Sequence, residues 1–296
     1  MSEPARGEKR TVVVAGATGY LGKHVVRALH RDGWRVRALA RDPARLAEAR
    51  DACDEVFVGE ATKPETLAGL FDGAHAAFSS IGIRHVHRHP TYEDVDYGAN
   101  IHLVDGAVAA GVKRFAFVSV LHGDELRARS PLVNARERVV DRLRESGMET
   151  VILRPTGFFN DMGDIFRMAQ KGTCWLIGSG DTKINPIHGA DLADVAASAL
   201  AAAEPAAEIP AGGPDVLSQR DIAELAFRVL DRRVKCRRIG PGVIRFLAHL
   251  ARPFNKNASA LALMFSMLGE RDGVAPSYGT EHLETFFQHL AAEAAK

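Results

Sequence analysis

The sequence is poor in cysteine and has no excess of charge of one sign, and each shortage excludes a class of protein. Its three cysteines, Cys53, Cys174 and Cys236, are widely spaced and form no CxxC pair. This spacing excludes a disulfide framework and a zinc ribbon, and it fits a reducing cytoplasm. The 38 basic and 37 acidic residues nearly cancel, so the composition gives no sign of a nucleic-acid partner or of binding to an anionic membrane.

Long apolar runs are also missing. The most apolar C-terminal stretches, residues 243–250 and 258–268, are much shorter than the roughly 20 residues that cross a bilayer. Residues 1–10 are polar, without the apolar core of a secretory signal, and we expect them to form a disordered tail. No membrane span is expected. Neither a GxSxG elbow nor a Walker-type Gly-Lys-Ser/Thr occurs, so the sequence does not support a hydrolase or a nucleoside triphosphatase.

The first half of the chain alternates β-branched runs with amphipathic helical patterns. Such alternation is typical of βαβ units that build a parallel sheet. The expected strands cover residues 11–15, 35–40, 55–58, 75–80, 114–120 and 150–153. The expected helices cover residues 22–31, 43–50, 64–71, 95–110 and 131–146.

The second half has a looser pattern of shorter strands among helices. Strands are expected at residues 174–177, 184–187, 207–209 and 234–239, and helices at 191–203, 218–230, 243–251, 258–268 and 280–292. We predict an α/β fold, a Rossmann doubly wound parallel sheet with a small C-terminal α/β cap. Residues 11–155 would form the NAD(P)-binding domain. Residues 156–296 would complete the sheet and add a small substrate domain.

A glycine-rich loop gives the strongest indication of function. It follows an apolar strand, opens an amphipathic helix and reads Gly16-Ala17-Thr18-Gly19-Tyr20-Leu21-Gly22. Gly16 would permit a tight turn, Gly19 would let the backbone approach a pyrophosphate, and Gly22 would let the helix pack on the sheet. We expect a dinucleotide here, held by Gly16, Thr18, Gly19, Tyr20, Leu21 and Gly22. The spacing is GxxGxxG, so a merely tight strand-to-helix turn is the alternative.

The end of the second expected strand bears on the choice between NADP(H) and NAD. Arg41 stands there, and a guanidinium can pair with a 2′-phosphate, which favours NADP(H). Asp42 follows at once, so NAD remains open, and Arg41 could also be a solvated surface charge. Topology alone places further cofactor contacts after the third strand (Glu60 and Ala61) and after the fourth (Ser79 and Ser80).

These motifs resemble those of the atypical short-chain dehydrogenase/reductase superfamily, in its NmrA-like branch. The resemblance covers residues 11–200 and includes Val95-Asp96-Tyr97-Gly98-Ala99-Asn100, Gly111 to Phe115 with Ser119, and Arg154-Pro155-Thr156. Stretches of the second half, such as Pro276-Ser277-Tyr278-Gly279-Thr280, look like plant-type divinyl chlorophyllide 8-vinyl reductases. The resemblance implies an NADPH-dependent reductase, with Pro155 and Thr156 also near the cofactor, and it would suit a homodimer. It does not carry over the substrate.

The catalytic residues depart from the superfamily's usual pair, a Tyr and a Lys four residues on. The matching positions here hold Leu132 and Arg136, and Arg136 could still bond a ribose hydroxyl. Ser119 is expected to face the nicotinamide, or else to satisfy local backbone groups. Tyr97 could be a substitute acid, or could simply pack between helix and sheet.

Two functions therefore remain open. One is an NADPH-dependent reductase of a small conjugated or carbonyl substrate. The other is a non-catalytic NADP(H)-binding redox sensor or assembly factor.

One histidine-rich segment follows the fourth expected strand. His85, His87 and His89 would share a face if the segment were extended. A metal site, a solvated loop and a cationic rim for a carboxylate substrate are the three interpretations. We predict no metal, because no carboxylate or cysteine lies near in sequence. His188 and Asp191, by contrast, are expected to have a structural role near a helix N-terminus.

Overall fold

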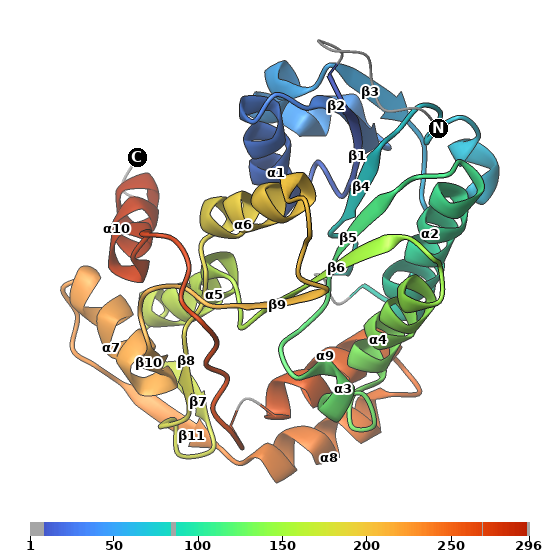
Figure 1. Cartoon of the computed structure of the whole chain (residues 1–296). Helices are drawn as coiled ribbons and strands as arrows, with labels where there is room; N and C mark the ends of the chain where they lie inside the picture. The colour runs from blue at the N-terminus through green and yellow to red at the C-terminus, as the bar shows by residue number, and fades with distance from the viewer. Residues whose placement is uncertain (1–8, 84–86, 268, 295–296) are drawn as a thin grey trace.

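A seven-stranded sheet forms the centre of the protein, as a computed structural model shows (Figure 1). The structure describes residues 9–83, 87–267 and 269–294. The strands of this sheet are β1 (Thr11–Ala15), β2 (Arg35–Ala40), β3 (Glu55–Val58), β4 (Ala76–Ser79), β5 (Arg114–Val118), β6 (Glu149–Pro155) and β9 (Glu208–Ala211). Their order is β3-β2-β1-β4-β5-β6-β9, and every neighbouring pair is parallel. The predicted Rossmann fold is confirmed.

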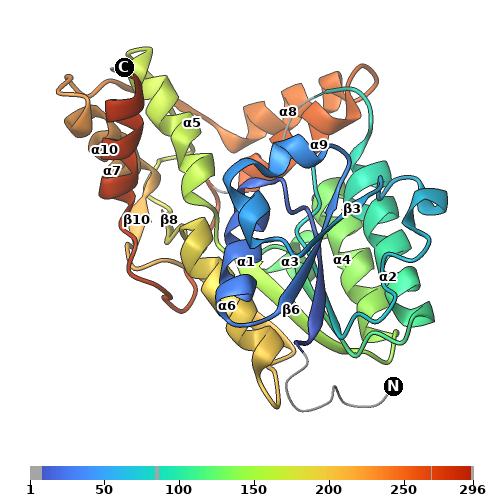
Figure 2. The same cartoon turned by 90° about the horizontal axis from the view of Figure 1, so that it is seen from above.

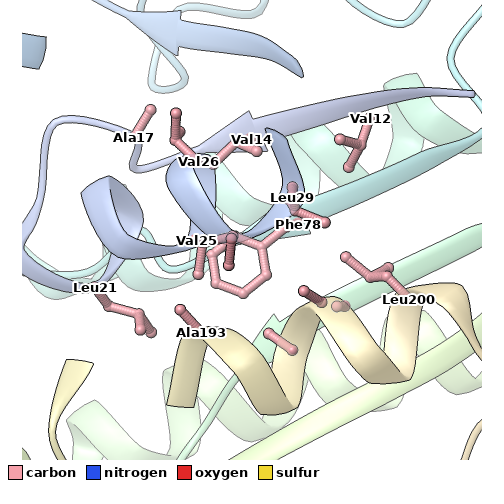
Figure 3. Packing of buried hydrophobic residues seen from close by; sticks show 14 of the residues in the cluster. Val12, Val14, Ala17, Leu21, Val25, Val26, Leu29, Phe78, Ala193 and Leu200 are labelled. Carbon is pink, nitrogen blue, oxygen red and sulfur yellow. The ribbon is translucent and has the colours of Figure 1, made fainter. Parts of the chain in front are cut away.

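Helices cover both faces of the sheet, which explains why the central parts of its strands are mostly apolar. Figure 2 shows α1 (Tyr20–Arg31) and α6 (Gly189–Ala201) on one side and α2 (Asn100–Ala109) and α4 (Pro131–Arg144) on the other. Successive residues of β1 point to opposite faces. Val12 and Val14 therefore join the core under α1 and α6, close to Phe78 and Leu200 (Figure 3), whereas Val13 joins the core on the other face.

The second half of the chain adds a smaller layer with a hydrophobic core of its own. Its helices are α5 (Phe159–Gln170), α7 (Gln219–Val229) and α10 (Leu283–Ala294). Two small sheets accompany them, β11 (Cys236–Ile239) with β7 (Cys174–Ile177) and β10 (Leu217–Ser218) with β8 (Lys183–Ile184). This layer corresponds to the predicted cap, while α6 and β9 return to the large sheet. A domain boundary at residue 155 stays a prediction.

A helical pair flanks this layer. Helix α8 (Pro241–Ala251) packs chiefly against α9 (Lys256–Met267), and α9 contacts α4. The short helix α3 (Gly123–Leu126) lies near the same corner (Figure 1). Among the helices of the described residues, none has the length and apolarity that a membrane span requires.

Several expected elements differ from the structure for local reasons. The helix expected at residues 64–71 is only a 3-10 turn, η2 (Pro64–Leu67), because Gly69 follows in a left-handed conformation with φ +80°. The segment expected to be helical at residues 43–50 is likewise mostly 3-10, η1 (Pro43–Ala52). The strand expected at residues 184–187 shortens to β8, because Pro186 cannot donate a ladder hydrogen bond.

Two further differences concern helices. The helix expected at residues 95–110 begins as a wider π-turn, η3 (Glu93–Ala99), and continues as α2. The side-chain amide of Asn100 donates to the carbonyls of Val95 and Asp96, which occupies acceptors of the preceding turns. Helix α5 was not expected at all. It begins after Phe158, which provides no side-chain cap, so the usual start signal is missing.

Candidate functional site

The glycine-rich loop and the loop after β4 meet at the carboxyl edge of the sheet. The backbone N–H of Ser80 donates to the Ala15 carbonyl at 3.2 Å. A Cβ added at Gly16 would lie 2.7 Å from the Ser80 hydroxyl oxygen. Strand order reverses between β1 and β4, and ligands of α/β sheets bind at such a switch point.

Three glycines shape the loop that enters α1. Gly16 has φ +84°, a left-handed conformation that a side chain rarely adopts. The Gly19 N–H donates to the Gly16 carbonyl at 2.9 Å, and a Cβ at Gly22 would lie only 2.0 Å from that same carbonyl oxygen. The first turn of α1 can therefore sit directly on the loop only if Gly22 has no side chain.

The N-terminus of α1 suits an anion. Gly19 is its exposed N-cap, it supplies no capping side chain, and the first turn has no acidic residue. The N–H groups of a first helical turn and the helix dipole favour a phosphate at such an end. The loop therefore fits the diphosphate of a dinucleotide.

Tyr20 and Leu21 have side chains that face away from this loop. The Tyr20 hydroxyl accepts a hydrogen bond from the Gly189 N–H at 3.0 Å, and its ring meets Phe158 and His188 edge to face. Leu21 is buried in the core. Their predicted cofactor contact would thus come from backbone N–H groups. Thr18 is half-buried within the loop itself.

Two histidines join α1 to α6 beside Tyr20. The rings of His24 and His188 are 5.2 Å apart. Burial lowers the pKa of His24 to about 4 and also lowers the pKa of His188. His188 accepts a hydrogen bond from the Ala190 N–H and caps α6, while the Asp191 carboxylate accepts one from the Glu281 N–H. Both contacts fit the structural role expected of His188 and Asp191.

Arg41 lies just after β2, with 61% of its side chain exposed. Its guanidinium is 3.9 Å from the carboxylate of Glu60, which also pairs with Lys63 at 2.8 Å. The hydrogen bond from Lys63 holds the pKa of the Glu60 carboxylate below its ordinary value. Asp42 instead accepts a hydrogen bond from the Ala44 N–H and caps η1. Asp42, the carboxylate that could have indicated NAD, therefore serves as a helix cap in this structure.

Ala61 and Ser79 are buried among other groups. The Ala61 carbonyl is 2.9 Å from a ring nitrogen of His102. Ser79 is fully buried and donates to the Asn100 side-chain oxygen at 2.6 Å, and Asn100 donates in turn to the Ile81 carbonyl. Ser79 and Asn100 therefore hold the loop after β4. Of the two predicted serines, only Ser80 is partly exposed. The sequence indicated Asn100 only as part of a motif.

Arg136 is fixed beneath that loop. Its guanidinium is 2.8 Å from the fully buried Asp96 carboxylate and donates to the Val118 carbonyl at 2.8 Å. A Cβ at Gly82 would lie 1.8 Å from Arg136 Nη2. Burial raises the pKa of Asp96, and the Arg136 charge opposes that rise. Arg136 thus lies where a ribose-binding cation was expected. Its guanidinium is bonded to two protein groups, the Asp96 carboxylate and the Val118 carbonyl.

Ser119 belongs to a buried network of charges. Its hydroxyl donates to the Glu137 carboxylate and its side chain is almost fully buried. Arg154 donates to both oxygens of Glu137 at 2.8 and 3.0 Å, and to Glu208 at 2.8 Å. No motif of the sequence indicated this network. Its one signal is Glu137 itself, which stands on the buried face of α4 between Val133 and Val140.

Tyr97 and Thr156 also have protein partners. The guanidinium of Arg138, on α4, lies 3.5 Å from the centre of the Tyr97 ring. The Thr156 hydroxyl donates to the Asn185 carbonyl at 2.5 Å, and Pro155 ends β6 in a buried position. Roles of these residues in proton transfer or cofactor binding stay predictions.

The histidine-rich segment is only partly visible, because His85 lies outside the described residues. Within the part of the chain that the structure describes, no cluster of three His, Cys, Asp or Glu side chains is arranged to hold a metal ion. The cysteines there are free thiols, and Cys174 and Cys236 are partners in the register of β7 and β11.

The chain is similar in sequence to proteins of several functions. The profile described as NmrA-like family matches residues 8–293. A photosystem II assembly factor, Ycf39 of Guillardia theta, is 27% identical over 94% of this chain and 89% of its own length. The chloroplastic divinyl chlorophyllide a 8-vinyl-reductase of Zea mays is 28% identical over 96% of this chain and 80% of its own length.

Solved structures share the fold. The NADPH-dependent quinone oxidoreductase QOR2 of Escherichia coli, solved with NADPH, superimposes with a TM-score of 0.73. It is 20% identical, and the match covers 95% of this chain and 99% of that one.

Proposed function

The chain belongs to the NmrA-like family, and from that premise we propose that it is an NADPH-dependent reductase of the atypical short-chain dehydrogenase/reductase type. The observation that carries the proposal is the loop from Gly16 to Gly22, which leads into the uncapped N-terminus of α1. The backbone amides of that turn would hold the diphosphate. The likeness to a quinone oxidoreductase solved with NADPH supports the same cofactor.

The charges after β2 and β3 favour NADPH over NADH. Arg41 and Lys63 provide two cations where a 2′-phosphate would lie, on either side of Glu60. Asp42, which could have held a ribose hydroxyl, caps η1 instead. The 2′-phosphate would replace Glu60 as the partner of at least one of these cations.

When bound, the nicotinamide supplies the hydride. The chain's own residues orient the reactants: the Asp96–Arg136 pair and the Ser79–Asn100 bond fix the loop after β4, at the edge where the nicotinamide would lie. The Ser119 hydroxyl points its proton at Glu137, and Arg138 covers the Tyr97 ring. We therefore assign the proton to water, with Ser119 and Tyr97 as the protein groups to test.

We infer a small conjugated or carbonyl compound as substrate. The names of two similar proteins, a vinyl reductase and a quinone oxidoreductase, support that class. We place the activity in the cytoplasm, in keeping with three free cysteines. A homodimer stays a prediction.

One set of observations favours the second function, a non-catalytic NADP(H) sensor or assembly factor. Leu132 and Arg136 stand where Tyr and Lys are usual, and Ser119 is buried in a charge network. The similarity to an assembly factor points in the same direction. Such a protein would bind NADPH as tightly as a reductase but would not oxidise it.

The decisive experiment measures NADPH oxidation with a panel of quinones, enones and vinyl-substituted aromatics. A reductase is expected to turn over at least one of them, and Gly22→Ala should abolish that turnover, because its Cβ would meet the Gly16 carbonyl. A parallel melting curve shows whether this variant is folded. Tight NADPH binding without oxidation of any compound would favour the sensor.

A further inference from the structure

Helix α8 presents an apolar face to solvent. Four of its residues follow the spacing i, i+3, i+4 and i+7, so they share one side of the helix. They are Val243, Phe246, Leu247 and Leu250, exposed by 52%, 63%, 51% and 55%. Ala248, on the opposite side, is buried, and Phe254 just after the helix is 71% exposed. We call these five exposed side chains the α8 apolar face.

This arrangement is the reverse of an ordinary surface helix, whose apolar side faces the core. Helix α8 packs chiefly against α9. Figures 1 and 2 both show α8 at the outer edge of the molecule, with α9 between it and α4. A contiguous exposed apolar surface of this kind marks an interaction site.

The chain around this face is strongly basic. Residues 232–269 contain eight Lys or Arg residues and no Asp or Glu, although the whole chain has 38 basic and 37 acidic residues. The eight are Arg232, Arg233, Lys235, Arg237, Arg238, Arg245, Arg252 and Lys256. Arg245 is neutralised by Glu270. Arg252 and Lys256, in and after the turn that ends α8, are exposed.

We propose that the α8 apolar face docks on the surface of an anionic lipid bilayer, with α8 lying in the plane of the interface. A short helix with aromatic and aliphatic side chains on one side, in a basic surrounding, has the composition of interfacial helices. At 11 residues, α8 is far too short to cross the membrane. Anionic headgroups attract the flanking cations, and the apolar side chains enter the acyl boundary.

The charge argues against a second copy as the occupant. If the α8 apolar faces of two copies packed together, the basic residues within 232–269 of both copies would also come together, and their like charges would repel. A bilayer with negative headgroups matches both the apolar and the basic part of the surface.

Docking would also bring part of the segment after β4 close to the membrane. Asn257, on α9, donates to the His87 and Pro90 carbonyls at 2.7 and 2.9 Å and accepts from the Tyr92 N–H at 2.9 Å. These groups belong to the segment that follows β4 at the carboxyl edge of the sheet. If the proposed reductase function holds, an apolar substrate could enter from the bilayer. The docking itself does not depend on that function.

Flotation with lipid vesicles tests the docking without cofactor or substrate. The full chain is mixed with vesicles of phosphatidylcholine alone, or of phosphatidylcholine with phosphatidylglycerol, at low and high salt. We expect flotation with the anionic vesicles only, weakened at least several-fold by high salt. The double variant Phe246→Ser, Leu250→Ser should lose flotation. Its melting temperature should not fall, because both side chains are exposed in the folded protein.

Val216→Ser is the matched control, because Val216 is similarly exposed, at 48%, but lies outside the α8 apolar face. It should float like the unchanged protein. Three results would overturn the proposal: no flotation with anionic vesicles, equal flotation of the double variant, or a dimer that the double variant dissociates. The last would assign the surface to a second copy. Failure of NADPH oxidation leaves all three readouts unaffected.

Discussion

Two opposing charges meet where the 2′-phosphate of NADPH would lie. Arg41 attracts a phosphate, whereas Glu60, 3.9 Å from its guanidinium, repels one. Lys63 pairs with Glu60 at 2.8 Å and so reduces that repulsion. The preference for NADPH therefore depends on a balance that single substitutions can shift in either direction.

Replacing Arg41 with Ala should weaken NADPH binding by about tenfold, because a charge-assisted phosphate contact contributes about 1.5 kcal/mol. NADH has no 2′-phosphate, so its affinity should stay within about twofold. Fluorescence titration of both cofactors checks this. An equal loss for NADPH and NADH would show that Arg41 does not contact the 2′-phosphate.

Glu60→Gln should have the opposite effect. The substitution removes a negative charge beside the phosphate, where a Coulomb interaction at about 4 Å contributes on the order of 1 kcal/mol. We expect NADPH affinity to rise a few-fold while NADH affinity stays constant, in the same titration. Weaker NADPH binding would mean that Glu60 positions Arg41 rather than opposing the phosphate.

Measurements of stability and turnover can distinguish the role of Ser119 from that of Glu137. Glu137→Ala should lower the free energy of unfolding by about 3–5 kcal/mol, since it removes the fully buried carboxylate that accepts two hydrogen bonds from the buried Arg154. Ser119→Ala should cost only about 1–2 kcal/mol. Urea unfolding gives both values. If water supplies the proton, Ser119→Ala should also keep most of any NADPH oxidation, and a complete loss in the folded variant would instead make Ser119 the donor.

Helices α1 and α6 are joined by neutral histidines, which makes their contact sensitive to pH. The titratable and charged groups that act on the His24 ring are those of His188, Arg27, Asp194 and Glu281. Because burial lowers the pKa of His24 to about 4, from 6.5, the unfolded chain takes up a proton between these values that the folded protein does not. This stabilising contribution is complete above about pH 6.5 and is lost as the pH falls towards 4.

The His24→Gln variant should therefore lose less stability on acidification than the unchanged protein. The difference between pH 7 and pH 4.5 should be about 1 kcal/mol, because the ring is partly exposed and solvent screens the effect. Urea midpoints at the two pH values measure it. Parallel loss in both proteins would show that another group sets the acid sensitivity, such as His188, whose pKa burial also lowers.

The elements of the large sheet could be predicted because their signals are local. Strands β1, β2 and β3 have the bounds that the β-branched runs indicated. Helix α5 could not be found by its start, because Phe158 provides no cap, although Phe159, Met162 and Phe166 carry the helical spacing. The π-turn before α2 depends on Asn100 bonding back to earlier carbonyls, which no periodicity reveals.

For the molecule as a whole, too, some features can be predicted from local sequence and others depend on contacts between distant residues. The proposed position of the dinucleotide follows from the strand order and the glycine loop, both of which can be predicted from local sequence patterns. The partners of Ser119 and Arg136 come from residues far away in the chain, Glu137 and Asp96. A buried charge is placed by tertiary packing, so the sequence could suggest these side chains but not where they point.

The central claim is that backbone amides at the start of α1 hold the diphosphate of NADPH. Gly19→Asp tests it most directly, because Asp is a good N-cap and should keep α1 stable while its charge repels the phosphate. Gly19→Asn has a side chain of the same shape without the charge and serves as the control. We predict that NADPH titration detects binding to the unchanged protein, weaker binding to the Asn variant, and none to the Asp variant at unchanged melting temperature. Equal NADPH affinity in all three proteins, or none in the unchanged protein, would contradict the account.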